Sequence, residues 1–116
     1  MSTATMSPTR PLPSRAMMAR YVAFLVLKAI HEGTYADVAL DRGLRQHPNL
    51  STADRRLVTE LVYGCARQQG QLDQSIDRLA TKPASKQPPD VRTILHLGLY
   101  QLSALDRVPA SAAVHT

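Results

Sequence analysis

Residues 88–105 read PPDVRTILHLGLYQLSAL, and this stretch decides the fold of the chain. Its two prolines and Asp90 predict the start of a helix, because proline is tolerated in the first turn and a carboxylate suits the positive end of the helix dipole. A helix this apolar has to be covered by neighbours on several sides, which predicts the centre of a small helical bundle. At roughly 100° per residue, the apolar arc covers about two thirds of the circumference and contains Val91, Ile94, Leu95, Leu97, Gly98, Leu99, Leu102, Ala104 and Leu105.

The other residues of this central helix divide into a polar strip and one isolated amide. Gln101 falls in the middle of the apolar arc, so its side chain is expected to be buried and hydrogen-bonded to backbone groups at a neighbouring helix end or turn. We therefore place Gln101, together with Gly98, among the structural residues. The polar strip is narrow and consists of Arg92, Thr93, His96, Tyr100 and Ser103.

Hydrophobic periodicity and end signals predict four helices before the central one. Ser14 is expected to cap the first helix and Gly33 to end it, and Gly70 is expected to separate the third from the fourth. No strand pattern or repeat stands out, so we expect an all-α bundle in a single domain, residues 14–116, whose last helix is cut short. Ser51 or Thr52 is expected to cap the third helix, which runs through Asp54 to about residue 68, and the other three helices are expected at residues 15–32, 35–46 and 71–81.

The first thirteen residues, MSTATMSPTRPLP, differ in composition from the rest of the chain. They are rich in Ser, Thr and Pro, and they contain Arg10 but no acidic residue. We expect residues 1–13 to form a disordered basic arm, although an organellar transit peptide has a similar composition.

The composition is otherwise typical of a globular cytoplasmic protein. No stretch approaches the roughly 20 apolar residues that a membrane span requires, so no membrane partner is expected. The single cysteine, Cys65, excludes an internal disulfide and a cysteine-based metal site. It lies on the apolar face of the third helix and is expected to be a small buried structural residue.

The charge distribution points to nucleic acid. The net charge is +5, and 11 of the 14 basic residues are arginine, whose planar fork suits phosphate. No acidic residue precedes Glu32. Cations beside aromatic rings could hold a nucleic-acid strand by phosphate contact and base stacking, but Phe24 could equally pack on a neighbouring helix and the cations could simply be solvated. The candidate RNA-binding residues are Arg15, Arg20, Tyr21, Phe24 and Lys28 on the first helix, and Arg56 and Arg67 on the third.

Catalytic and metal-binding motifs are not found in the sequence. It has no Gly-rich phosphate or dinucleotide loop, no spaced metal cluster and no nucleophile with a plausible local base. The four histidines share no spacing. We therefore predict a binding or interaction module with no catalytic residue and no metal site.

Three segments, taken in order, resemble the NusB-like RNA-binding domain: residues 14–40, 55–79 and 91–114. The strongest pieces are ELVYG with Leu72-Asp73 downstream, and GLYQL followed by Val108-Pro109. They are most similar to the version of the domain that begins the bacterial small-subunit rRNA 5-methylcytosine methyltransferases. The chain departs from the pattern at His96, where the family often has arginine.

This resemblance implies a fold of two packed three-helix halves and an N-terminal basic segment that contacts RNA. Arg20 matches the arginine of the family's Ala-Arg-x-x-Ala pattern, and Arg15 falls in the basic run before it. The methyl donor, S-adenosylmethionine, and the catalytic cysteines are expected only in a missing downstream domain, so no catalytic role passes to Cys65.

The expected function is therefore that of an RNA-binding accessory domain, non-catalytic by itself, which docks an rRNA (cytosine-5-)-methyltransferase on small-subunit rRNA. Two alternatives remain open. One is a free-standing NusB-type transcription antitermination factor that binds RNA with a ribosomal protein, and the other is a protein-binding helical adaptor.

Overall fold

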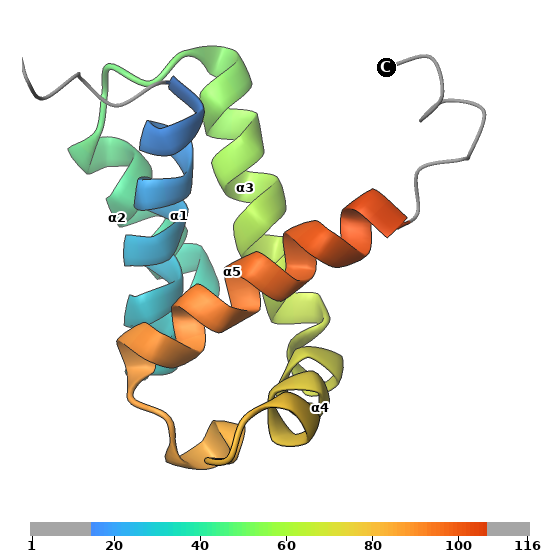
Figure 1. Cartoon of the computed structure of the whole chain (residues 1–116). Helices are drawn as coiled ribbons and strands as arrows, with labels where there is room; N and C mark the ends of the chain where they lie inside the picture. Colours follow the sequence, from blue (N-terminus) through green and yellow to red (C-terminus); the bar gives the residue numbers. More distant parts are fainter. Residues whose placement is uncertain (1–14, 107–116) are drawn as a thin grey trace, which may run out of the picture.

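A computed structural model describes residues 15–106 of the chain, and the described part is helical throughout with no strand (Figure 1). The predicted all-α class is therefore confirmed. The elements in order are α1 (Arg15–His31), α2 (Ala36–Gln46), α3 (Thr52–Arg67), α4 (Gln69–Leu79), the short 3-10 helix η2 (Ala84–Lys86) and α5 (Pro89–Asp106). The predicted basic arm, residues 1–13, and the predicted start of a last helix after Pro109 lie outside the described residues.

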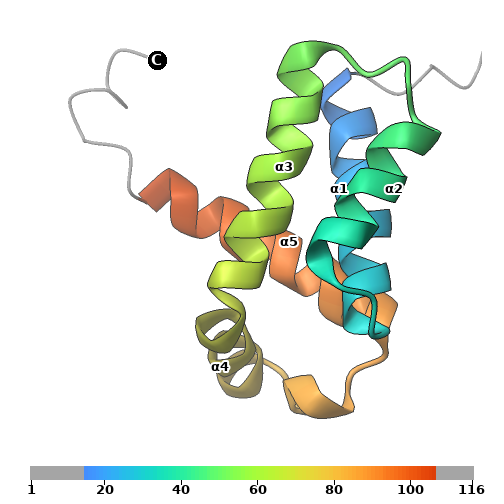
Figure 2. The ribbon, with the colours of Figure 1, turned by 180° about the vertical axis from the view of Figure 1, so that it is seen from behind.

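The helices pack as one three-helix unit with two further helices against it. α1 contacts α2, α3 and α5, while α4 contacts α3 and α5. Figure 1 shows α5 crossing in front of α1 and α3, and Figure 2 shows α2 and α3 on the opposite side. The unit α1–α3 corresponds to the expected first half of the bundle, and α4 and α5 belong to the second.

Local signals explain most helix ends. The Ser51 side chain accepts a hydrogen bond from the Asp54 backbone N–H at 3.1 Å and so caps α3. Gly33, with φ +114°, ends α1 in a conformation that few other residues adopt. The predicted break at Gly70 is wrong, because the chain leaves the helix at Gln68 and Gly70 lies inside α4. An exposed glycine within a helix costs only about 1 kcal/mol, which the packing of α4 tolerates.

The hydrophobic core lies between α1, α3 and α5 and is closed by α2 and α4. Cys65 is buried in it, as predicted, with Sγ donating to the His96 carbonyl oxygen at 3.8 Å. The buried cluster consists of Ala19, Val22, Ala23, Val26, Leu27, Ala39, Leu40, Val58, Leu61, Val62, Cys65, Leu72, Leu97 and Tyr100.

The predicted rotation of α5 about its axis is wrong. Thr93 and His96 are fully buried, whereas Ile94 and Leu102, from the predicted apolar arc, are each 59% exposed. The polar strip faces inward because other helices supply partners for it, chiefly Asp73 on α4. A helix that is apolar around most of its circumference does not reveal its buried side by hydrophobicity alone.

Candidate nucleic-acid interface

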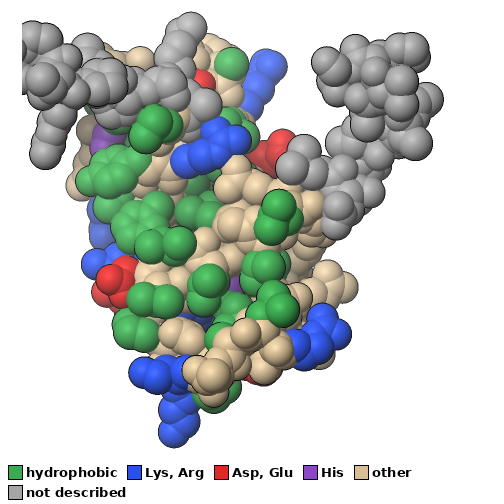
Figure 3. Space-filling view, in the orientation of Figure 1, with side chains coloured by type: hydrophobic (Ala, Val, Ile, Leu, Met, Phe, Trp, Pro, Cys, Tyr) green, Lys and Arg blue, Asp and Glu red, His purple; other side chains and the backbone are tan. Residues whose placement is uncertain are grey.

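One side of α1 faces a groove that opens between α1 and α5. Met17, Tyr21, Phe24 and Lys28 follow the spacing of three and four residues that places side chains on one helix face. The groove has a volume of about 540 Å³, and Figure 3 shows hydrophobic side chains gathered on this face of the molecule. It is lined by Met17, Arg20, Tyr21, Phe24, Ile94, Leu97, Gly98 and Gln101.

α5 crosses α1 near the C-terminal end of α1 and diverges from it toward the N-terminal end (Figure 1). Where the two helices meet, His31 Nδ1 lies 2.7 Å from Thr93 Oγ1. Nearer the N-terminal end of α1, Tyr21 is 52% exposed and Met17 is 60% exposed. Phe24 lies between them and is half-buried against the core. Of the two aromatic residues predicted for this face, Tyr21 is therefore exposed and Phe24 packs against the core.

Arg20 is held at the border of this groove by a residue that the sequence analysis placed elsewhere. Its Nε donates to Gln101 Oε1 at 2.6 Å, and Gln101 Nε2 donates to the Leu97 carbonyl oxygen at 3.0 Å. Gln101 is half-buried and bonds within its own helix. The expected burial of Gln101 against a neighbouring helix end is wrong, and its amide orients Arg20 instead.

The predicted basic residues do not form one continuous patch. Arg56 and Arg67 are both exposed on α3, with Glu60 between them in sequence. Glu60 lines one hollow together with Arg56 and another together with Arg20. Arg55 lines the same hollow as Arg56. We did not predict Arg55 as an RNA-binding residue, although the two adjacent arginines in the sequence indicated it. Lys28 is half-buried, and the Arg15 side chain lies outside the described part.

A cluster of polar side chains joins α4 to α5 beneath the groove. Arg92 donates to both carboxylate oxygens of Asp73, at 3.2 and 2.6 Å. His96 Nε2 lies 2.7 Å from Asp73 Oδ1, and its ring contacts the His31 ring edge-to-face at 4.9 Å. Because His96 is fully buried, it is a structural residue and lies away from the candidate interface.

Burial and charge change the pKa values of this cluster. Burial, followed by the neighbouring His96 and Arg92, lowers the pKa of His31 to about 4. Burial also lowers the pKa of His96, although its hydrogen bond to Asp73 opposes this. Burial alone would raise the pKa of Asp73, but the hydrogen bonds from Arg92 and His96 outweigh it and leave that pKa below its usual value. Both histidines are consequently neutral in the folded protein near neutral pH.

The model of the NusB family matches residues 17–116 of the chain. The chain belongs to the NusB family. A "Probable ribosomal RNA small subunit methyltransferase B" from Synechocystis sp. is 58% identical over 99 residues, which cover 84% of this chain and 22% of that protein. The "Ribosomal RNA small subunit methyltransferase B" of Thermus thermophilus is 40% identical over 84 residues, covering 72% and 21%.

The chain thus spans about a fifth of the length of these curated relatives. A "Putative methyltransferase" of Mycobacterium tuberculosis is 36% identical over 114 residues, covering 96% of this chain and 24% of that protein. No solved structure matches the chain significantly.

Two of the segments that carry the NusB resemblance meet in the core. A Cβ atom on Gly64, in the ELVYG segment, would collide with the ring of Tyr100, in the GLYQL segment. The Tyr100 hydroxyl donates to Glu60 at 3.4 Å, and burial raises the pKa of Tyr100. The structural role expected for Gly98 is wrong, because Gly98 is exposed and a Cβ there would meet nothing within 4 Å. The close approach of the Tyr100 ring therefore requires glycine at position 64.

Neither a metal centre nor a membrane span appears in residues 15–106. No group of three or more His, Cys, Asp or Glu side chains in this range is arranged to hold a metal ion. None of the helices in the same range is long and apolar enough to cross a membrane.

Proposed function

We propose that this NusB-family chain is the RNA-binding accessory domain of an rRNA (cytosine-5-)-methyltransferase and that it docks the enzyme on small-subunit rRNA. The observation that carries the proposal is the exposed face of α1, where Arg20, held by Gln101, lies beside the aromatic rings of Tyr21 and Phe24. The names of the relatives indicate that the RNA is small-subunit ribosomal RNA. In this proposal, S-adenosylmethionine binding and methyl transfer belong to the part of the relatives that the chain does not cover.

In this proposal, RNA binding has two physical components, the contact of a positive charge with phosphate and the stacking of a base on an aromatic ring. An arginine whose Nε is already bonded to an amide is oriented before RNA arrives, so less side-chain entropy is lost when it contacts a phosphate. The Tyr21 ring, half-exposed one residue away, offers a surface on which an unpaired base stacks. Arg56 lines a hollow next to Glu60, which also borders the hollow that Arg20 lines, and it extends the proposed contact to α3.

The test is a salt titration of RNA binding with Arg20→Ala. Using a single-stranded segment of small-subunit rRNA, we expect weaker binding and a slope of log affinity against log salt that is smaller by about 0.7 to 1, the value for one lost phosphate contact. Arg78→Ala, an exposed arginine on α4, is the charge-matched control. An unchanged slope in Arg20→Ala, or the same loss in Arg78→Ala, would contradict the proposal.

A second candidate function, protein docking, is favoured by the apolar character of the groove itself. Ile94 and Met17 are about 60% exposed, and contiguous exposed apolar surface is typical of protein interfaces. A ribosomal-protein partner, as in the antitermination alternative, would use this surface. Ile94→Ser separates the two functions, since it should leave RNA affinity and its salt slope unchanged while weakening any protein docked in the groove.

A further inference from the structure

A hollow that contains Glu60 lies between α1, α3 and α5, next to the candidate interface. Its volume is about 360 Å³, within the roughly 300 to 1,000 Å³ typical of small-molecule sites, so it has room for one nucleobase. Arg20 and Gln101 line both this hollow and the α1–α5 groove, so the two are adjacent. A strand that stacks one base on Tyr21 can therefore place a neighbouring base in the hollow. The other residues that line this Glu60 hollow are Leu57, Glu60, Leu61, Tyr100 and Ala104.

The Glu60 carboxylate is the acceptor that this hollow offers to a ligand. Tyr100, which is only 3% exposed, donates its hydroxyl proton to Glu60 Oε2 at 3.4 Å from the side of the core. Within residues 15–106 the Glu60 side chain makes no other hydrogen bond or ion pair, and it is exposed. Because a carboxylate has about four lone-pair sites, Oε1 and the remaining lone pair of Oε2 are available to hydrogen-bond donors of a ligand.

The chemistry of this hollow suits a base, and guanine above the others. A carboxylate repels phosphate, so the group that enters has to be uncharged and has to donate hydrogen bonds. Unpaired RNA bases are recognised on their Watson–Crick edges. On that edge guanine has two adjacent donors, N1–H and the exocyclic amino group, which match the two oxygens of one carboxylate. Cytosine and adenine have only an amino group there, and uracil has only one ring N–H. Leu57, Leu61 and Ala104 supply apolar surface for the flat face of the ring.

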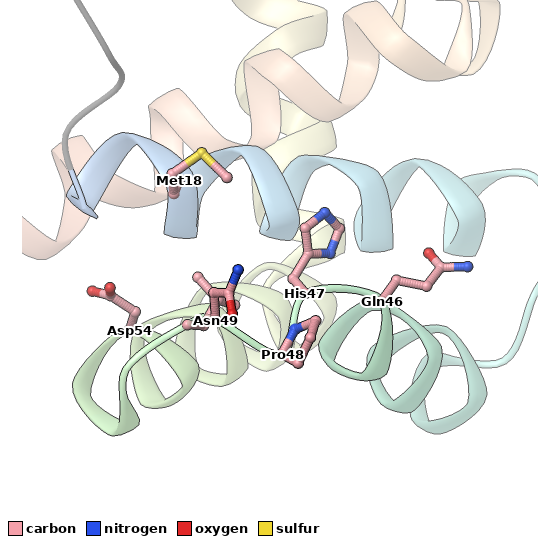
Figure 4. A pocket seen from close by; sticks show the side chains of 7 residues that line it. Met18, Gln46, His47, Pro48, Asn49 and Asp54 are labelled. Atoms are coloured by element: carbon pink, nitrogen blue, oxygen red, sulfur yellow. The ribbon is translucent and has the colours of Figure 1, made fainter.

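The other hollow beside α1 does not bring its polar groups together in this way. It lies between α1 and the loop that joins α2 to α3 (Figure 4). Figure 4 shows Gln46 and Asp54 at its opposite ends, with their polar groups pointing away from each other. One edge of a base could not meet both groups. This hollow therefore provides a negative control, in which Asn49→Ala, at an exposed loop position, should not change base selectivity.

We propose that the Glu60 hollow receives one unpaired guanine of the bound RNA, with the Glu60 carboxylate accepting hydrogen bonds from N1–H and the exocyclic amino group. The inference rests on the proposed RNA-binding function and adds base selectivity to it. Arg20 and Tyr21 hold the strand without regard to sequence, and Glu60 selects the base.

The experiment measures the binding of short oligo-rU strands to the 116-residue chain by fluorescence anisotropy at fixed salt. One strand carries a single central guanosine and the other a single central inosine. Inosine keeps the two rings of guanine but lacks the exocyclic amino group, so its size and stacking are nearly the same and one hydrogen bond is lost. We expect the guanosine strand to bind about threefold to tenfold more tightly, the range that one such bond provides.

Glu60→Gln tests the role of the carboxylate. The amide replaces one acceptor by a donor, so the ratio of the two affinities should fall close to one. Glu32→Gln, the same chemical change at an exposed position after α1, should leave the ratio unchanged. A carboxylate that merely repelled RNA would give a different result, because Glu60→Gln would then strengthen the binding of both strands equally. A ratio that stays the same in Glu60→Gln therefore overturns the inference.

The remaining outcomes also decide the inference. Equal, salt-dependent binding of the two strands by the wild-type chain overturns the guanine site and leaves the proposed function standing. Should Glu60→Gln fail to fold, Ala104→Leu, whose larger side chain fills the hollow, must reduce the ratio instead. If neither strand binds, both the inference and the proposed function fail.

Discussion

Mild acid should destabilise this fold through His31. The pKa of His31 is about 4 in the folded protein and about 6.5 in an unfolded chain. At about pH 5 the unfolded chain therefore holds a proton on this ring that the folded protein does not, and stability rises with pH wherever the unfolded state binds more protons. The stability that His31 contributes is complete above about pH 6.5 and is lost as the pH falls toward 4.

The magnitude follows from the two pKa values. Linkage between about pH 7.5 and about pH 5 gives a loss of about 2 kcal/mol from His31 alone, and His96, whose pKa is also lowered, adds to it with the same sign. Carboxylates contribute little in this window because their ordinary pKa values lie near 4. A loss of this size corresponds to a fall in melting temperature of about 8 to 16 °C for a domain of this length.

The assay is urea unfolding followed by circular dichroism at the two pH values. His31→Asn is the informative variant, because Thr93 donates its hydroxyl proton to the Pro89 carbonyl oxygen and so receives a proton from His31 Nδ1, a donor that an Asn side chain supplies without titrating. We expect the variant to lose most of the pH dependence. Equal unfolding free energies of the wild-type chain at both pH values, or full pH dependence in His31→Asn, would refute the reasoning.

Two further predictions concern the core. Gly64→Ala should destabilise the fold by about 1 to 3 kcal/mol, because the new methyl group meets the Tyr100 ring. The control Gly98→Ala should be neutral or up to about 1 kcal/mol stabilising. Thermal unfolding of both variants checks this prediction, and equal effects of the two substitutions would contradict it. Burial raises the pKa of Cys65 to about 12, so the thiol of the folded chain should not react with an aromatic disulfide reagent near pH 8. The thiol should react at once when the chain is unfolded in urea, and rapid reaction of the folded chain would contradict the prediction.

The helices themselves could be predicted from the sequence, because their signals are local. Ser51 before α3 and Gly33 after α1 act through backbone groups within a few residues, and the apolar stripe of α3 has one clear side. The burial of Cys65 followed from the same stripe. The exposure of Arg20 and Tyr21 on one helix could also be predicted, since residues next to a strongly apolar face lie outside it.

Only the tertiary structure decided how α5 is rotated and what its polar residues do. Hydrophobicity alone favoured the burial of Ile94 and Leu102, which are exposed in the structure. Asp73 on α4 pairs with Arg92 and His96, and these interactions stabilise the orientation in which the polar strip of α5 faces the core. A buried polar group is tolerated when its partners are present, and those partners come from helices far apart in sequence. The bond between Gln101 and Arg20, 81 residues apart, has the same origin, because nothing within either helix specifies which side chain the other will meet.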